Sequence, residues 1–468
     1  MYRLITVALL SALLPGAGVL AAPPAAPPAN PIDKLYAQVT PSLVAVQYTL
    51  DTELGRRDLC EGGVVVSSDG MVIAPLAMFA PVIPDVQMKD FKIIVPRHLA
   101  EPREVNAIFL GRDERTGLAV LKPQSSEGVK WVPVNFQEIP IQVGEPVISV
   151  GLLPKAAGYR SYVSRSRVAA EIHGAVPLML VASGQLTVTG SVVLDAQGQA
   201  IGFVNATAGQ QILLNDNQNR LAAIINPPTF FVPTSDFRLT LKDPPVAGHP
   251  MKLPWIGLPQ VASLRKDVAQ FFHLENQPAV EIGDVIPGSP GDLAGLKRGM
   301  KIVKLNGQPL QCGDDPNDVA QIFARKILRM KVGQKITLSV LTDSNQPLKQ
   351  VTVTLGERPP GVSTAKRFYD DALGLAVRQI VFADTYVRKL PADQKGVIVA
   401  LLKPQGPAQV AKLQDEDLIL QMNGKPVTGV EEFKKDFQQL RRTQPQEPIV
   451  FVVLRQGQEQ TVRIEAPQ

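Results

Sequence analysis

An internal repeat with a fixed offset of 117 positions occupies the C-terminal half of the chain, between residues 250 and 466. Gly374 lies 117 positions after Gly257, and Asn423 lies 117 positions after Asn306, without gaps. The same offset joins further identical pairs: Leu258/Leu375, Pro287/Pro404, Pro290/Pro407, Ala294/Ala411, Leu296/Leu413, Ile302/Ile419 and Gly307/Gly424. Because a repeat of this length means that one folding unit occurs twice, we expect two similar small domains, at 250–357 and 367–466.

Each copy of the repeat continues with a helical pattern and ends in two alternating strands. In the first copy, apolar residues recur at helical spacing in 319–327, and strands are predicted at 336–340 and 351–355. In the second copy, the corresponding segments are 430–440, 449–454 and 462–464. The pattern leaves open whether Val319, Ile322, Phe323, Phe433 and Phe437 face the core or a ligand.

The preceding segment, 33–240, which we call the body, consists of short apolar runs separated by turn residues. One example is the run Gly63–Val66, followed by the turn Ser67–Gly70. Many short strands at such spacing predict β-barrels or a β-sandwich. With 41 prolines, 36 glycines and 45% hydrophobic residues, the composition indicates a globular, mainly β chain. The net charge of +5 is spread along the chain and gives no support to nucleic-acid binding.

The N-terminus predicts export from the cytoplasm. An apolar run, Leu4–Leu14, precedes the small-residue site that ends at Ala21, which is typical of a cleaved signal peptide at 1–21. The alternative is an uncleaved membrane anchor, although the run is short for a bilayer. A Pro/Ala-rich linker is predicted at 22–32. Cys60 and Cys312 fall in different domains, so we expect no disulfide and at least half-buried thiols.

Both repeat units begin with an apolar-Gly-apolar turn. The turns are Trp255-Ile256-Gly257-Leu258 and Ala372-Leu373-Gly374-Leu375. Such a turn can direct successive backbone N–H groups at a peptide carboxylate, while the following strand edge pairs with the peptide. With Pro287–Pro290 and Ala294–Gly299, the units resemble PDZ domains of the circularly permuted type found in bacterial proteases. The second copy departs from that pattern at 415–417, where a glycine is usual. Purely structural spacers remain the alternative.

The whole arrangement resembles the HtrA family of envelope serine proteases, which implies a trypsin-like double-barrel body followed by two PDZ domains. The segment Gly62–Ile73 resembles the family's first hairpin, and Arg112–Lys122 resembles the segment that carries the catalytic Asp. Aligned on these motifs and on the hairpin at 198–202, the His, Asp and Ser positions of the family hold Ala77, Gly117 and Thr189. The resemblance therefore implies a protease body with a degenerate catalytic triad.

The residues at these positions are poorly suited to peptide hydrolysis. Thr189 keeps a hydroxyl but has no adjacent base, and β-branched Thr187 and Val188 fit badly in a turn that must present an oxyanion hole. A rearranged site that pairs His173 with Ser183, Thr189 or Ser191 is the alternative, and Asp113 is interpreted as a solvated turn carboxylate. Neither a metal nor a cofactor is implied, since no ligand spacing or phosphate loop occurs.

We therefore expect a catalytically inactive, periplasmic or envelope-associated protein that binds peptides or unfolded chains through PDZ domains. It would act as an adaptor, a chaperone-like holder or a regulator of active HtrA-type proteases, with no stable membrane span after signal cleavage. The resemblance also implies a possible homo-trimer. The alternatives are a serine-type endopeptidase with residual or unconventional catalysis and a purely structural envelope protein.

Overall fold

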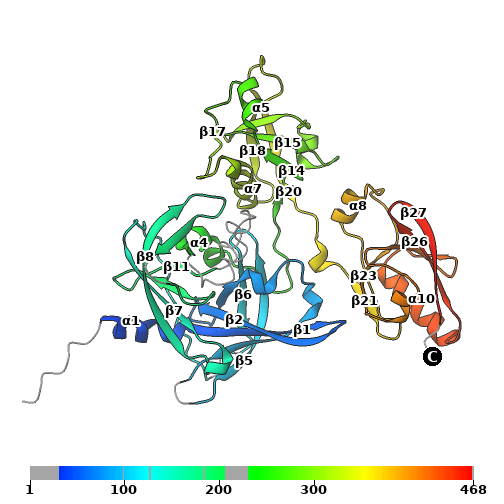
Figure 1. The fold of residues 1–468 in the computed structure, drawn as a ribbon, viewed down its shortest axis with the longest axis horizontal. Helices are drawn as coiled ribbons and strands as arrows, with labels where there is room; N and C mark the ends of the chain where they lie inside the picture. The colour runs from blue at the N-terminus through cyan, green and yellow to red at the C-terminus, as the bar shows by residue number, and fades with distance from the viewer. Residues whose placement is uncertain (1–30, 98–99, 126–127, 183–184, 206–229, 466–468) are drawn as a thin grey trace, which may run out of the picture.

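The computed structural model describes residues 31–97, 100–125, 128–182, 185–205 and 230–465. The predicted signal peptide lies outside the described residues, as does the predicted linker except for residues 31 and 32, which begin α1 (Pro31–Val39). Figure 1 shows the body, the first repeat unit above it and the second repeat unit to its right, in orange and red. The predicted fold class, mainly β with two barrels and two α+β units, is confirmed.

The described strands of the body form two closed antiparallel barrels of six strands each. The first has the order β1-β2-β3-β6-β5-β4, and the second has the order β10-β11-β12-β9-β8-β7. Their bounds are β1 Leu43–Thr52, β2 Gly55–Val65, β3 Val72–Pro75, β4 Met88–Val95, β5 Arg103–Asp113, β6 Leu118–Pro123, β7 Pro146–Leu152, β8 Ser161–Ile172, β9 Leu178–Ala182, β10 Val192–Leu194, β11 Ala200–Phe203 and β12 Phe230–Pro233. The short 3-10 helix η1 (Thr40–Ser42) precedes β1, and three others lie between strands: η2 Leu76–Phe79, η3 Asp85–Gln87 and η4 Lys155–Ala157.

The two barrels pack on each other through one shared core. Buried residues of the first barrel, such as Val64 and Val120, cluster with Val192 and Phe203 of the second. Helix α4 (Thr234–Lys242) follows the second barrel and adds Phe237 to this core. The shared core fixes the barrels relative to each other, so loops from both meet at a defined seam.

The first unit has an antiparallel sheet of order β14-β15-β16-β18-β19 with helix α7 beside it. A separate short pair, β13 with β20, closes the ends of the unit. Its elements are β13 Pro254–Trp255, β14 Gln260–Ser263, α5 Lys266–Phe271, β15 Val280–Asp284, α6 Pro290–Leu293, β16 Lys301–Leu305, β17 Gln308–Pro309, η5 Pro316–Asp318, α7 Val319–Leu328, β18 Lys335–Leu341, β19 Lys349–Thr354 and β20 Gly356–Glu357.

The second unit has the same order with one additional strand at the edge, β21-β22-β23-β24-β26-β27. Its elements are β21 Arg367–Asp370, β22 Leu375–Arg378, α8 Phe382–Arg388, β23 Val397–Leu402, α9 Pro407–Val410, β24 Leu418–Met422, β25 Lys425–Pro426, α10 Val430–Thr443, β26 Ile449–Arg455 and β27 Gln458–Ile464. The short helix η6 (Val362–Thr364) lies in the link between the units.

The repeat holds at the level of single hydrogen bonds. Asn306 and Asn423 both take left-handed backbone angles, with φ of +50° and +47°. Their side-chain oxygens accept from the backbone N–H groups of Thr337 and Val450, at 2.8 and 2.7 Å. In both units the helix buries its aromatic residues, Phe323 in α7 and Phe433 with Phe437 in α10, so these residues face the core.

The expectation of half-buried cysteines is wrong. Cys60 and Cys312 are both exposed and both free. Cys60 lies on β2 beyond the shared core, where its side chain contacts the Tyr159 hydroxyl at 3.7 Å, and Cys312 lies in the loop after β17. In the part of the chain that the structure describes, no helix has the length and apolar character needed to cross a bilayer.

Candidate functional site

The three positions that should hold a catalytic triad lie along the seam between the barrels. Ala77 is exposed in η2, Gly117 lies between β5 and β6, and Thr189 is half-buried before β10. The Gly117 carbonyl accepts from the Leu76 N–H at 3.0 Å and from the Asn205 side chain at 3.1 Å. These contacts join the η2 segment and the Gly117 turn of the first barrel to the end of β11 in the second.

The Thr189 segment reaches the same seam. Its neighbour Gly190 donates to the Val204 carbonyl at 2.8 Å, next to Asn205. The Thr189 backbone also packs against β2, since a Cβ added to Gly62 would lie 3.0 Å from the Thr189 carbonyl oxygen. The structure therefore brings the Thr189 segment to the end of β11, next to Asn205, whose side chain donates to the Gly117 carbonyl.

No described imidazole contacts the Thr189 hydroxyl. The ring of His173 lies 3.4 Å from both Glu171 and Asp314, and 60% of its side chain is exposed. His249 contacts the Ala247 carbonyl, and His273 is exposed at the end of α5. His98 and Ser183 lie outside the described residues. His173 thus joins the body to the first unit and does not act as a base for Thr189 in this structure.

The backbone N–H groups of Thr187 and Val188, just before Thr189, donate to side chains of the body. In a trypsin-like site, the N–H groups of the nucleophile and of the residue two before it hold the oxyanion. Here Thr187 fills the second position, and its N–H donates to Ser149 Oγ at 2.8 Å. The next N–H, of Val188, donates to the Tyr162 hydroxyl at 2.9 Å, and burial raises the pKa of that hydroxyl. The N–H of Thr187 is therefore not available to a reacting carbonyl.

The interpretation of Asp113 as a solvated turn carboxylate is wrong. Asp113 is fully buried, because Arg115 and Thr240 satisfy its oxygens at 2.8 to 2.9 Å. It stabilises the turn that precedes Gly117. In the described part of the chain, no group of three or more potential metal ligands comes together.

The apolar-Gly-apolar loop of the first unit, residues 255–258, has backbone N–H groups that are free to bind a ligand. Gly257 has φ of +84°, and a Cβ there would lie 2.1 Å from Ser289 Cβ, so glycine is required. The Gly257 carbonyl accepts from Ile286 at 3.0 Å, and the Ile256 carbonyl accepts from Gly291 at 2.8 Å. Within the described residues, the N–H groups of Ile256, Gly257 and Leu258 have no acceptor. Trp255, the fourth predicted residue, packs edge-on against Phe382 of the second unit at 5.7 Å.

Strand β14 follows this loop with an edge that no described strand covers. Its other edge pairs with β15. At the far end, the Ser263 hydroxyl donates to the Asn317 carbonyl at 2.7 Å and accepts from the Ala320 N–H at 3.2 Å. These bonds fix α7 beside β14. The strand edge and the helix therefore flank a surface that suits an extended peptide.

The loop of the second unit has the same framework but different partners. The Gly374 and Leu373 carbonyls accept from Lys403 at 2.8 Å and Ala408 at 3.1 Å, one repeat offset after the bonds of the first unit. The N–H of Leu373, however, donates to the Asp370 side chain at 2.8 Å. Leu375 pairs with Asp370 in the β21–β22 ladder, and Ala372 lies in the connecting hairpin loop. The chain's own groups therefore occupy this loop.

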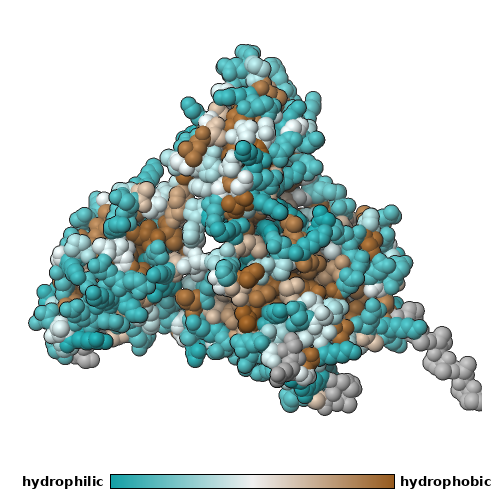
Figure 2. Space-filling model, turned by 180° about the vertical axis from the view of Figure 1, so that it is seen from behind, coloured by the Kyte–Doolittle hydropathy of each residue, from teal (hydrophilic) through white to brown (hydrophobic). Residues whose placement is uncertain are grey.

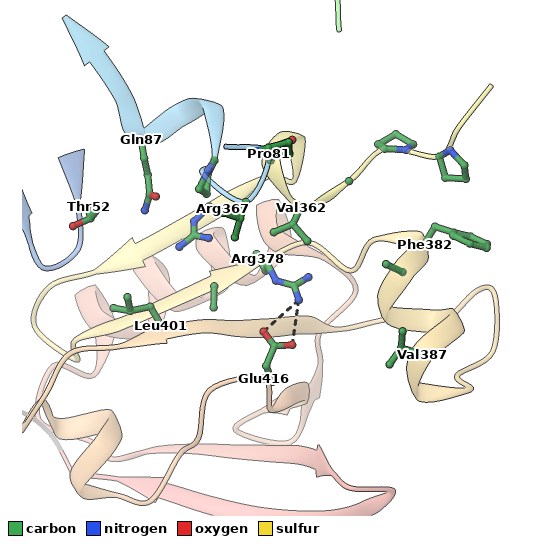
Figure 3. A pocket seen from close by; sticks show the side chains of 18 of the residues that line it. Thr52, Pro81, Gln87, Val362, Arg367, Arg378, Phe382, Val387, Leu401 and Glu416 are labelled. Carbon is green, nitrogen blue, oxygen red and sulfur yellow. Dashed lines mark hydrogen bonds and ion pairs between the residues drawn. The ribbon is translucent and has the colours of Figure 1, made fainter. Parts of the chain in front are cut away.

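A cleft of about 1270 Å³ lies where the body, both units and the link between the units meet. Figure 3 shows Arg367, Arg378, Phe382 and Val387 of the second unit on one side and Thr52 and Gln87 of the body on the other. Tyr386 on α8 donates to Asp284 of the first unit, which holds the pKa of Asp284 below its ordinary value. No sequence pattern predicts this cleft, because its walls come from segments far apart along the chain.

The surface around the cleft is partly apolar. Large exposed apolar side chains at the cleft include Leu54, Val82 and Val387. Seen from behind, brown apolar patches lie on the body and on both repeat units (Figure 2). Exposed apolar surface of this kind is common on proteins that contact other chains.

Comparisons with known proteins agree with this architecture. The PDZ domain family matches residues 281–333 and, in a second match, residues 372–466. A "Probable periplasmic serine endoprotease DegP-like" of Marinomonas sp. is 26% identical over 384 residues, which is 81% of this chain and 74% of the relative. A protein of the same description from Brucella suis is 25% identical and covers 81% of this chain and 68% of the relative.

Two PDZ matches, DegP-like relatives and an HtrA-type structural neighbour support an HtrA/DegP-like family for this chain.

A solved structure supports the fold. The "HtrA-type protease AlgW with decapeptide" superimposes with a TM-score of 0.51 at 17% identity, covering 70% of this HtrA/DegP-like chain and 99% of the solved one. Both units of the chain are therefore PDZ domains on a trypsin-like double barrel.

Proposed function

We propose that this HtrA/DegP-like protein is a non-catalytic member of its family that captures exposed C-terminal ends of unfolded chains. In the bacterial envelope it would serve as an adaptor, a chaperone-like holder or a regulator of active HtrA-type proteases. The observation that carries the proposal is the set of three acceptor-free N–H groups at Ile256, Gly257 and Leu258 beside the uncovered edge of β14. This arrangement suits a terminal carboxylate followed by an extended peptide.

Loss of catalysis is supported by the seam between the barrels. Thr189 has no imidazole partner among the described residues, and the Thr187 N–H is bonded to Ser149. Loss of a base and of an oxyanion donor together removes most of the rate enhancement of a serine-type hydrolase. The body then serves as a rigid support that holds the first unit.

Peptide capture can be tested with a single glycine substitution. Gly257→Ala places a Cβ against Ser289, which moves the loop at 255–258, so we expect affinity for a fluorescent C-terminal peptide to fall at least about tenfold, or about 1.4 kcal/mol. Amidation of the peptide C-terminus is expected to cost about as much. Fluorescence anisotropy measures both effects.

Gly333→Ala is the matched control for this experiment. It has similar backbone strain, with φ of +80°, in the same unit but meets no neighbouring atom. Equal binding by wild type and the Gly257→Ala variant, or equal binding of free and amidated peptides, would contradict the proposal.

A serine-type endopeptidase with residual activity is the second candidate. It is favoured by the Thr189 hydroxyl at the seam and by the names of the relatives, which are described as serine endoproteases. Casein turnover or labelling by a fluorophosphonate that is lost in Thr189→Ala would establish it. The family resemblance also leads us to propose a homo-trimer, which the mass in solution tests.

A further inference from the structure

Strand β21 lies on the edge of β22 that corresponds to the uncovered edge of β14 in the first unit. The ladder is antiparallel, with the pairs Arg367↔Arg378, Phe368↔Val377, Tyr369↔Ala376 and Asp370↔Leu375. A further bond from the Gln379 N–H to the Lys366 carbonyl, at 2.8 Å, extends it. Because PDZ ligands bind by adding an antiparallel strand, β21 fills the place of a ligand.

The side chains of β21 are seated between the sheet and α10. The ring of Phe368 lies 6.1 Å from Phe433 and 5.7 Å from Phe437, tilted toward each by about 60°. Both helix residues are fully buried, so Phe368 covers the aromatic face that α10 presents beside β22. Lys366 adds an ion pair to Glu431 in the first turn of α10, at 3.1 Å. Strand β21 thus contacts both β22 and α10.

The end of β21 supplies a carboxylate to the loop. Asp370 accepts from the Leu373 N–H at 2.8 Å, and the Asp371 carbonyl accepts from the Gly374 N–H at 3.2 Å. The equivalent N–H groups in the first unit, at Ile256 and Gly257, have no acceptor among the described residues. The side chain of Asp370 therefore takes the position of a peptide's terminal carboxylate.

We propose that β21 is an internal ligand that closes the second PDZ domain, and that this domain accepts peptides with an aromatic residue two positions before a terminal carboxylate. The inference rests on the proposed function, because it assumes that these strand edges bind peptides. An external peptide must displace β21, so its apparent affinity is reduced by the small fraction of molecules in which the strand is released.

The opposite face of β21 is held by the body. Arg367 forms an ion pair with Glu53 at the tip of the β1–β2 hairpin, at 2.8 Å, with side chains only 12% and 8% exposed. The Tyr369 hydroxyl donates to Asp371 at 3.0 Å, and burial together with this carboxylate raises the pKa of Tyr369 to about 12. Movement of the second unit away from the body would remove the Arg367–Glu53 pair and favour release of the strand.

The test uses the full chain carrying Gly257→Ala, which disables the first loop. The probe is a fluorescent peptide with the sequence of residues 366–370 and a free C-terminus. Addition of Phe368→Ser is expected to increase probe affinity at least about tenfold, because it raises the released fraction. The matched control, Phe271→Ser, removes an exposed phenylalanine in the first unit and should leave the affinity unchanged.

Hydrogen exchange of wild type and variants provides a second readout that needs no ligand. Exchange of the β22 amides that face β21 should be faster in Phe368→Ser. If that variant unfolds, Asp370→Asn removes only the carboxylate and should give a smaller gain, about threefold. No gain in affinity and no faster exchange in either variant would overturn the proposal. Failure of the proposed function is distinguishable, since wild type would then bind no C-terminal peptide while the exchange of β22 would still report on β21.

Discussion

The backbone N–H of Thr187 is bonded inside the body and so is not free to stabilise an oxyanion formed at the Thr189 hydroxyl. The N–H of Thr187 is bonded to Ser149, and the side-chain oxygen of this residue is buried without a partner among the described residues. The nearby Gly117, with φ of +73°, makes a turn that holds no acid at all. The predicted loss of the three triad side chains would thus be accompanied by a backbone N–H that is committed to an internal bond.

Restoration of the triad side chains is expected to leave the body inactive. In the triple variant Ala77→His, Gly117→Asp and Thr189→Ser, the Thr187 N–H still faces Ser149, and absence of one oxyanion donor alone costs about 100-fold to 1000-fold in rate. Casein hydrolysis, assayed beside an active family member, should stay at background. Fluorophosphonate labelling of the triple variant would contradict this expectation.

At the scale of elements, helix α8 is held on the second unit by a buried ion pair. Arg378 of β22 contacts Asp384 of α8 at 2.6 and 2.8 Å, with side chains 6% and 9% exposed. Arg378 also contacts Glu416, a residue with φ of +69° where the first unit has Gly299 with φ of +83°. Glu416 thus keeps the turn of the repeat without glycine, and its carboxylate gains two arginine partners, Arg378 and Arg388.

Removal of one partner from this pair is expected to destabilise the second unit. Arg378→Met leaves Asp384 buried without its cation, so the free energy of unfolding measured in urea should fall by about 3 kcal/mol. Arg463→Met, which removes an exposed pair with Glu465, is the control and should change it by less than about 0.5 kcal/mol. Equal effects of the two substitutions would contradict the assignment.

The same pair predicts a pH dependence. Burial alone would raise the pKa of Asp384, but hydrogen bonds from Arg378 and the Val381 N–H outweigh it and hold this pKa below its ordinary value. A lowered pKa gives stability that is present above the unfolded value, about 4, and is lost as the pH falls through the folded value. The wild type should therefore lose more stability below about pH 4 than the Arg378→Met variant does, as thermal unfolding across the acid range can measure.

At the scale of the whole molecule, the first unit is docked on the body through α7. Asp236 of α4, whose side chain is 2% exposed, pairs with Arg325 of α7 and with Arg329, which follows that helix, at 2.7 Å each. Arg325 also donates to the Ala175 carbonyl at 2.6 Å, near the His173 contact with Asp314. These bonds set the direction in which the β14 edge faces solvent.

Asp236→Asn is expected to loosen the first unit from the body without unfolding either. The two arginines lose their shared anion, so small-angle scattering should show a larger radius of gyration, and proteases should cut the link at 243–253 faster. Asp343→Asn, an exposed change in the first unit, should alter neither measurement. An unchanged radius for Asp236→Asn would show that other contacts suffice for docking.

The sequence by itself determined the two barrels and the paired PDZ units, while the degenerate triad at Ala77, Gly117 and Thr189 stays a prediction. These features follow from patterns that can be recognised in the sequence, such as strand alternation, turn glycines and the 117-residue offset. Only the tertiary structure decided that Asp113 is buried by Thr240, that Thr187 donates to Ser149, and that β21 covers the edge of β22. Each of these depends on which groups meet in space. The two apolar-Gly-apolar loops have similar sequences, but they differ in the structure because only the loop of the second unit lies beside a strand of its own chain, β21.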